Sequence, residues 1–150
     1  KAAMEVYDGQ LLWLVIVGVV NSGGLADLAG SATKIQAALE ADPAIDGIFA
    51  LNADIATGAA LVASEATGRN AIIGTVDMSA DALTAIKDGK MAFAVDQQQY
   101  AQGYMSVVLL FLNITNAHEL GGGLPIYTGP GFVTADNVDK VMELVAAGTR

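Results

Sequence analysis

Three short hydrophobic segments in the middle of the chain are each followed at once by polar side chains. They are Ile45–Leu51 before Asn52, Ala71–Val76 before Asp77, and Met91–Val95 before Asp96 and Gln97. Helical patterns over Ala56–Ala66 and Ala80–Lys87 connect them. This alternation predicts a parallel sheet, because parallel neighbours need a long crossover connection. Ligands of such sheets bind beyond the carboxyl ends of the strands, so we expect the four polar side chains to gather there.

The flanking sequence predicts further elements around this sheet. Lys1–Tyr7 favours a short helix, and the continuous apolar run Leu11–Val20 predicts a strand buried on both faces. Three more helices are expected at Leu25–Glu40, Gln98–Thr115 and Val138–Ala147, and a last strand is expected at Leu124–Thr128. Together these elements predict one α/β domain over residues 1–150, a three-layer sandwich with a mainly parallel sheet.

The helix expected at Gln98–Thr115 differs from the others in its second half. Residues Tyr104–Leu112 are apolar almost all the way round the helix. A helix without a polar stripe packs against neighbours on more than one side. We therefore expect this segment to be buried on several sides.

Composition and charge narrow the function classes. The 150 residues are 53% hydrophobic and 15% charged, contain no cysteine and carry a net charge of -9. This acidic balance argues against nucleic acid and against anionic membranes, since both attract basic surfaces. The apolar run at 11–20 is shorter than the about 20 residues of a membrane span, and its acidic flank does not fit a signal peptide. Because the chain lacks an initial methionine, we expect a mature chain or an excised piece.

Possible reaction sites have simpler explanations. Gly23-Gly24 lacks a phosphate-binding motif and fits a packing turn, and His118, the only histidine, fits a solvated loop. The serines lack the G-x-S-x-G context of a nucleophile. Asp54, Asp77 and Asp96 could hold Mg²⁺ and accept phosphate. Such a site also needs paired acids at the end of the first strand and a lysine at the end of a later strand, and this sequence has neither at those positions. We therefore expect no catalytic residue, no metal and no cofactor.

A rim of amide and carboxylate groups remains at the predicted strand ends, formed by Asn52, Asp77 and Gln97, with Asn21 as a further candidate after the first apolar run. Asn and Gln both donate and accept hydrogen bonds, and an ionised Asp can accept two hydroxyls. A neutral ligand with many hydroxyl groups needs such partners. Asn52 and Asp77 fit equally well as caps of the helices that follow them. Spacing alone leaves both explanations open.

Several consecutive stretches carry a more specific likeness. They are Asp42–Asn52, Gly58-Ala59, Ile73–Asp77, Ala85–Ala92 and Val95–Tyr104, with Thr128-Gly129, Phe132–Thr134 and Asn137-Val138 near the end. They resemble the C-terminal half of type I periplasmic sugar-binding proteins, the ribose-, galactose- and xylose-type receptors of ABC importers. The effector domains of lac-repressor-type regulators share the fold. The net charge of -9 and the missing DNA-binding head make a regulator or a chemoreceptor the second choice.

The resemblance implies a function, a site and a location. It implies a flavodoxin-like lobe that binds a pentose or hexose in a periplasmic receptor, which serves a membrane permease and catalyses no reaction. Asn52, Asp77 and Gln97 match ligand-contacting positions of the family. Ala53 stands where the family commonly has Asp, and an arginine that often contacts sugar has no counterpart here. The class of sugar is therefore open.

The resemblance also implies a missing partner surface. Members of the family close two lobes on the sugar, and the helix after the position of Gln97 packs on the first lobe, which this sequence lacks. We expect helix 98–115 to pack on that lobe or on a partner chain through residues 104–112, or to fold back onto its own sheet. We also expect the single lobe to bind sugar weakly.

Overall fold

A four-stranded sheet forms the centre of the computed structural model, which describes residues 2–7, 10–15, 18–21 and 23–150, and side chains from residue 18 onward within those ranges. Its strands, in spatial order, are β3 (Gly47–Ala50), β4 (Ile72–Val76), β5 (Phe93–Asp96) and β6 (Gly131–Val133). β3, β4 and β5 are parallel, and β6 pairs antiparallel with β5. The predicted fold class, an α/β protein with a mainly parallel sheet, is confirmed.

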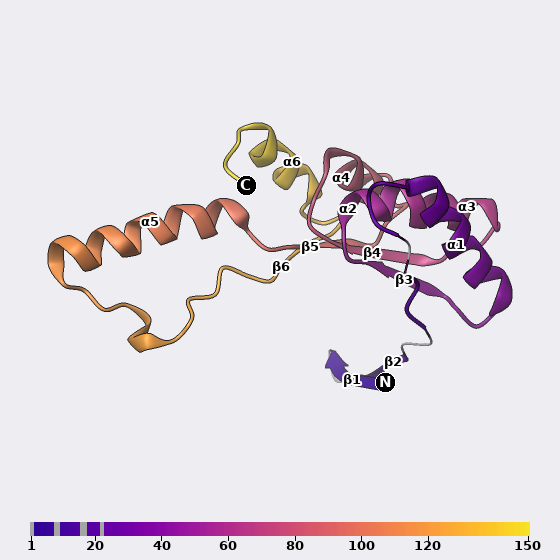
Figure 1. Ribbon diagram of the computed structural model, residues 1–150, viewed down its shortest axis with the longest axis horizontal. Helices are drawn as coiled ribbons and strands as arrows, with labels where there is room; N and C mark the ends of the chain where they lie inside the picture. Colours follow the sequence, from indigo (N-terminus) through magenta and orange to yellow (C-terminus); the bar gives the residue numbers. More distant parts are fainter. Residues whose placement is uncertain (1, 8–9, 16–17, 22) are drawn as a thin grey trace.

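Helices cover one face of this sheet (Figure 1). They are α1 (Leu28–Ala41), the continuous helical segment α2 (Ala53–Ile55), η1 (Ala56–Leu61) and α3 (Val62–Ala66), then α4 (Ala80–Lys87) and α6 (Val138–Ala146). Side-chain caps begin three of them: Asp27 accepts from Gly30 N at the start of α1, Asn52 accepts from Asp54 N and Ile55 N at the start of α2, and Ser79 accepts from Ala82 N at the start of α4. The predicted boundaries of these helices are close to those observed.

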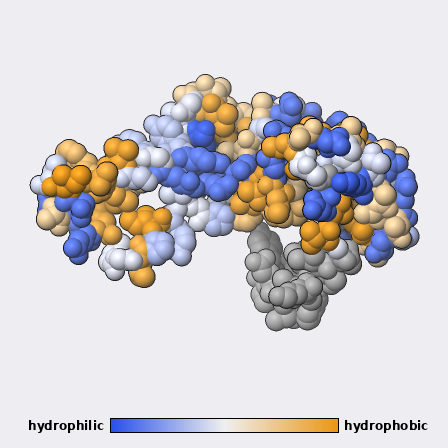
Figure 2. Space-filling view, in the orientation of Figure 1, coloured by the Kyte–Doolittle hydropathy of each residue, from blue (hydrophilic) through white to orange (hydrophobic). Residues whose placement is uncertain are grey.

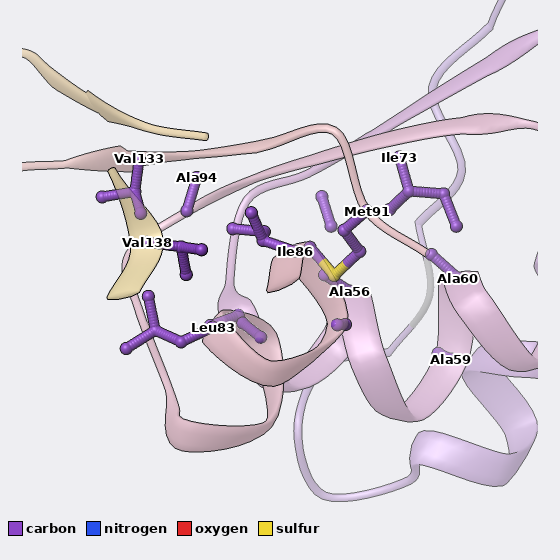
Figure 3. Close-up of a cluster of buried hydrophobic side chains, with 14 of the residues drawn as sticks. Ala56, Ala59, Ala60, Ile73, Leu83, Ile86, Met91, Ala94, Val133 and Val138 are labelled. Carbon is purple, nitrogen blue, oxygen red and sulfur yellow. The ribbon is translucent and has the colours of Figure 1, made fainter. Parts of the chain in front are cut away.

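The core lies between the sheet and this helical layer. Alternate residues of the strands point into it, including Ile73, Ala94 and Val133, which are at most 1% exposed. Figure 3 shows Leu83 and Ile86 of α4 in the same cluster, with Val138 beside Val133 and Ala94, and Met91 beside Ile73. The side of the core next to α1 is lined by alanines of the 53–66 segment, four of which are at most 1% exposed. Small side chains allow helix and sheet to approach closely here.

The opposite face of the sheet carries an aromatic row. Phe93 stacks on Phe49 and tilts against Phe132, with ring centroids 6.0 Å apart in both pairs. The Phe93 ring lies over Gly74, where a Cβ atom would come within 2.5 Å of it. Phe49 and Phe132 are more than half exposed. In the described part of the chain no helix covers this face, so the third layer of the predicted sandwich is not formed there.

The N-terminal segment differs from the prediction. Ala2–Tyr7 is not a helix but strand β1, which pairs antiparallel with β2 (Gln10–Val15) in a separate two-stranded sheet. β2 occupies part of the predicted strand Leu11–Val20, but it does not join the parallel sheet, and Val19 is 91% exposed. The dipeptide Asp8-Gly9 between two apolar segments is a sequence pattern that also favours a hairpin. These two residues themselves lie outside the described part.

Residues 99–130, which we call the arm, extend away from the helix-covered sheet (Figure 1). The arm contains α5 (Gln99–Asn116), the short 3-10 turn η2 (Gly121–Gly123) and an extended return to β6. None of the eighteen residues of α5, all of them described, is buried, so the expected burial on several sides and the fold-back onto the sheet are wrong for this chain alone. Leu124–Thr128 is not a strand, because no described strand lies beside it to share hydrogen bonds.

The arm is rich in exposed apolar side chains (Figure 2). Val107, Leu110 and Ile114 of α5 are 61–73% exposed. Despite this hydrophobicity, no helix in the described residues has the length and apolar character to cross a membrane.

Candidate functional site

The candidate site lies where the parallel strands end. Asn52 follows β3, Asp77 follows β4, and Gln97 follows β5, so the strand order brings all three to the same edge of the sheet. Beyond β3 and β4 the chain turns back into the next helix, whereas beyond β5 it continues into the arm (Figure 1). The carboxyl edge of an open parallel sheet is the usual place for a ligand.

Asn52 caps the helix that follows it. Its Oδ1 accepts hydrogen bonds from the backbone amides of Asp54 (2.8 Å) and Ile55 (3.2 Å). The capping explanation therefore holds for the oxygen of this side chain. Its amide nitrogen makes no hydrogen bond with the described residues and remains a possible donor to a ligand.

Asp77 does not cap a helix, because Ser79 takes that position before α4. Its backbone has φ 66°, a left-handed conformation that is uncommon for a residue with a Cβ atom. The backbone N–H of Asp77 donates to the carbonyl of Val95 at 2.9 Å, which ties the end of β4 to β5. The carboxylate is half-buried and therefore accessible at the sheet edge.

Two glutamine side chains converge on this carboxylate. Oδ1 of Asp77 accepts from Nε2 of Gln97 at 2.6 Å and from Nε2 of Gln99 at 2.8 Å. The structure thus brings Asp77 and Gln97 into direct contact across neighbouring strands. Gln99 was not among the residues singled out from the sequence, although it belongs to the Gln97-Gln98-Gln99 run that follows β5.

Gln97 also connects the sheet edge to the arm. Its backbone carbonyl accepts from the side-chain amide of Gln102 in α5 at 2.8 Å and from the hydroxyl of Thr128 at 3.1 Å. The segments that enter and leave the arm are therefore both hydrogen-bonded to Gln97, whose side chain contacts Asp77. A change in the position of the arm would act on Gln97 directly.

Asp96 was expected at the same rim, but its side chain points inward. It is fully buried, and its two oxygens accept from the backbone N–H of Gln98 (2.7 Å) and from Nε of Arg150 (2.8 Å). Asp96 directly precedes Gln97. Because successive side chains of a strand point to opposite faces, the Asp96 side chain points away from the face that Gln97 occupies. A fully paired, buried carboxylate is a structural group rather than a ligand-binding one.

A hollow of about 410 Å³ opens between α5 and the returning segment of the arm. Gln97 and Gln102 line it beside Met105, Leu109 and Ile126. Polar groups at one end and apolar groups along the sides are the usual composition of a small-molecule site.

Other candidate chemistry is not assembled at this edge. No group of three or more His, Cys, Asp and Glu side chains within the described ranges could hold a metal ion. Asn21, a further polar residue considered at the rim, lies in an exposed loop before α1. The site is thus composed of one carboxylate and the amide side chains around it.

Known proteins resemble the chain in both sequence and structure. A family model described as a periplasmic binding protein domain matches residues 1–117. The xylose/arabinose-binding protein XylF of Sulfolobus acidocaldarius is 29% identical over 132 residues, which are 84% of this chain and 32% of that protein.

Solved structures give the same picture. A carbohydrate transporter from Acidothermus cellulolyticus 11B, in complex with myo-inositol, is 41% identical with a TM-score of 0.73, over 83% of this chain and 43% of that one. The arabinose-binding protein AraP of Geobacillus stearothermophilus is 30% identical with a TM-score of 0.63, over 76% of this chain and 41% of that one. The chain thus spans less than half the length of each of these relatives. Because the family model matches more than half of its residues, the chain belongs to the periplasmic binding protein domain family.

Proposed function

We propose that this chain is the ligand-binding lobe of a sugar receptor of an ABC-type importer and that it works by binding, not by catalysis. The observation that carries the proposal is the contact of Gln97 with Asp77 at the carboxyl edge of the parallel strands. The relatives are sugar-binding transport proteins, which supports the same function. Asn52, at the end of the neighbouring strand, completes the proposed ligand-binding set.

The chemistry of these groups suits a neutral ligand with many hydroxyls. Asp77 accepts hydrogen bonds through its carboxylate, while the amides of Asn52 and Gln97 donate and accept. We infer a pentose, a hexose or a cyclic polyol of similar size. The myo-inositol in the Acidothermus cellulolyticus complex and the pentoses named for XylF and AraP are ligands of that kind.

The parent protein, in this proposal, is a two-lobed periplasmic receptor that delivers its sugar to a membrane permease. The matched regions make up 32% of XylF and 43% of the Acidothermus cellulolyticus structure, which leaves room for a second lobe in proteins of that length. A ligand held between two lobes loses most of its contact with water. One lobe alone offers only half of those contacts.

The arm is proposed to pack on the other lobe or, in the isolated chain, on a second copy. Its apolar side chains at Val107, Leu110 and Phe111 are more than 60% exposed, and a contiguous apolar surface of this kind favours association. Light scattering should then detect species larger than a monomer, and a Leu110→Lys variant should shift them towards monomer. A monomer whose α5 amides exchange rapidly with deuterium would contradict this proposal.

Sugar titration tests the proposed function. We expect the isolated chain to bind at least one of myo-inositol, D-xylose and L-arabinose with an affinity weaker than micromolar, because half of the enclosure is missing. Amide chemical shifts in ¹⁵N-labelled protein should move at residues 52, 77 and 97 as the sugar is added. The absence of any saturable shift with a full pentose and hexose panel would contradict the function, and micromolar binding would contradict the need for a second lobe.

Matched aspartate variants separate the site from the rest of the surface. Asp77→Ala should abolish the saturable shifts, because it removes the carboxylate and frees two glutamine amides. Asp136→Ala is the control: this exposed carboxylate makes no hydrogen bond or ion pair with the described residues. Equal affinities of the two variants would contradict the assignment of Asp77 to the site.

A further inference from the structure

Asp77 receives both of its glutamine donors on one oxygen. The distances from Oδ1 to Nε2 are 2.6 Å for Gln97 and 2.8 Å for Gln99. A carboxylate oxygen accepts through two lone pairs, so these donors occupy Oδ1. Oδ2 makes no hydrogen bond with the described residues and is the oxygen left for a ligand hydroxyl.

The two glutamines lie against different hollows. Gln97 lines the 410 Å³ hollow under α5, whereas Gln99 lines a separate recess of about 280 Å³ beside Ser79, Tyr100 and Arg150. Gln97 is therefore placed to turn towards a ligand. Gln99 lines a different recess, so it can hold Asp77 while Gln97 turns.

The backbone fixes both ends of the bond between Gln99 and Asp77. Gln98, just before Gln99, has a left-handed conformation (φ 58°, ψ 53°), and its N–H donates to the buried Asp96. Arg150 holds that same carboxylate. At the other end, the backbone of Asp77 is bonded to Val95. Groups that are ordered in advance need not lose entropy when a ligand binds.

We propose that Gln99 is a positioning residue for sugar binding: it fixes the orientation of the Asp77 carboxylate so that Oδ2 is available to ligand hydroxyls. Gln99 itself makes no contact with the ligand in this proposal. The inference rests on the proposed function, since it assigns Gln99 to the same site.

A matched pair of substitutions tests this role. Gln99→Met keeps the length and helix propensity of the side chain but removes the donor. Gln36→Met is the control, because Gln36 also donates to a carboxylate at 2.8 Å, that of Glu40, on the exposed side of α1 away from the site. In titrations with myo-inositol, D-xylose and L-arabinose, we expect Gln99→Met to weaken binding about three- to tenfold, the effect of one hydrogen bond. Gln36→Met should bind like the unaltered chain, and both variants should keep its melting temperature.

A second measurement does not depend on a ligand. Because both glutamines share Oδ1, Gln99→Met should shift the side-chain amide resonances of Gln97, and Gln36→Met should leave them in place. Unshifted Gln97 resonances would overturn the inference. Sugar binding by Gln99→Met with the same affinity as by the unaltered chain would also overturn the inference, but it would leave the proposed function intact. If the unaltered chain binds no sugar, the proposed function and this inference both fail.

Discussion

The helix-covered sheet and the arm have similar hydrophobic sequences but opposite environments. Leu83 in α4 is 2% exposed, while Leu110 in α5 is 61% exposed. α4 lies on the sheet and shares a core with β5 and α6, whereas α5 extends away from the sheet, is joined to its edge through Gln99 and Gln102 of its first turn, and buries none of its residues (Figure 1). The apolar content of a helix therefore does not determine whether it is buried; a complementary surface must lie within reach.

The same comparison explains why the candidate site lies where it does. The sheet supplies rigid strand ends that hold Asp77, and the arm begins within two residues of Gln97. Gln97 is thus shared between a packed region and an exposed one. In the two-lobed receptor proposed above, a residue in this position would respond both to the ligand and to the movement of the second lobe.

The largest effect should come from matched leucine truncations. Leu83→Ala removes a buried side chain and should lower the free energy of unfolding by about 2–5 kcal/mol. Leu110→Ala removes an exposed one and should change it by less than about 0.5 kcal/mol. Urea unfolding followed by circular dichroism measures both. If Leu110→Ala were as costly as Leu83→Ala, α5 would be packed in solution, and the contrast between the two regions would disappear.

Matched glycine substitutions should give effects of opposite sign. At Gly74 a new Cβ atom would lie 2.5–2.9 Å from the Phe93 ring, so Gly74→Ala should destabilise the sheet by about 1–3 kcal/mol. At Gly103 in α5 nothing lies within 4 Å, and Gly103→Ala should stabilise the helix by about 0.8–1 kcal/mol. Urea unfolding measures the first change, and slower hydrogen exchange of α5 amides measures the second. A stabilising Gly74→Ala would show that the aromatic row is not held over the glycine.

The smallest effect should come from an exposed ion pair that joins α4 to α6. Lys87 Nζ lies 2.7 Å from Asp139 Oδ1, and this hydrogen bond and the charge of Asp139 raise the pKa of Lys87 above 10.5. The folded state therefore binds this proton more tightly than the unfolded state. Its stabilisation is complete below pH 10.5 and is lost as the pH rises through the raised pKa.

The variant Lys87→Met isolates this contribution. Its melting temperature should be slightly below that of the unaltered chain at neutral pH, and the difference should shrink in high salt, which screens exposed charges. The difference should also vanish at a pH well above the lysine pKa. A difference that persists there would show that the lysine stem, not its charge, stabilises the contact.

The sequence predicted the strands and helices of the packed region well, because their patterns are local. The N-cap residue Ser79 and the hydrophobic pattern of Ala80–Lys87 predict both ends of α4 correctly. The three parallel strands begin and end within two residues of their predicted positions. The carboxyl edge of the sheet followed from the order of elements alone. That order also placed Asn52, Asp77 and Gln97 at one edge, although binding of sugar by them stays a prediction.

Only the tertiary structure decided which neighbour each segment and side chain meets. Asp96 and Gln97 are adjacent polar residues, yet one is buried against Arg150, 54 residues away, and the other lies at the rim. The N-terminal hairpin, the exposed arm and the sharing of one Asp77 oxygen by Gln97 and Gln99 likewise depend on pairing between segments. Local patterns encode the propensity of a segment to form a helix or strand, whereas burial and hydrogen-bond partners depend on which surfaces the rest of the chain provides.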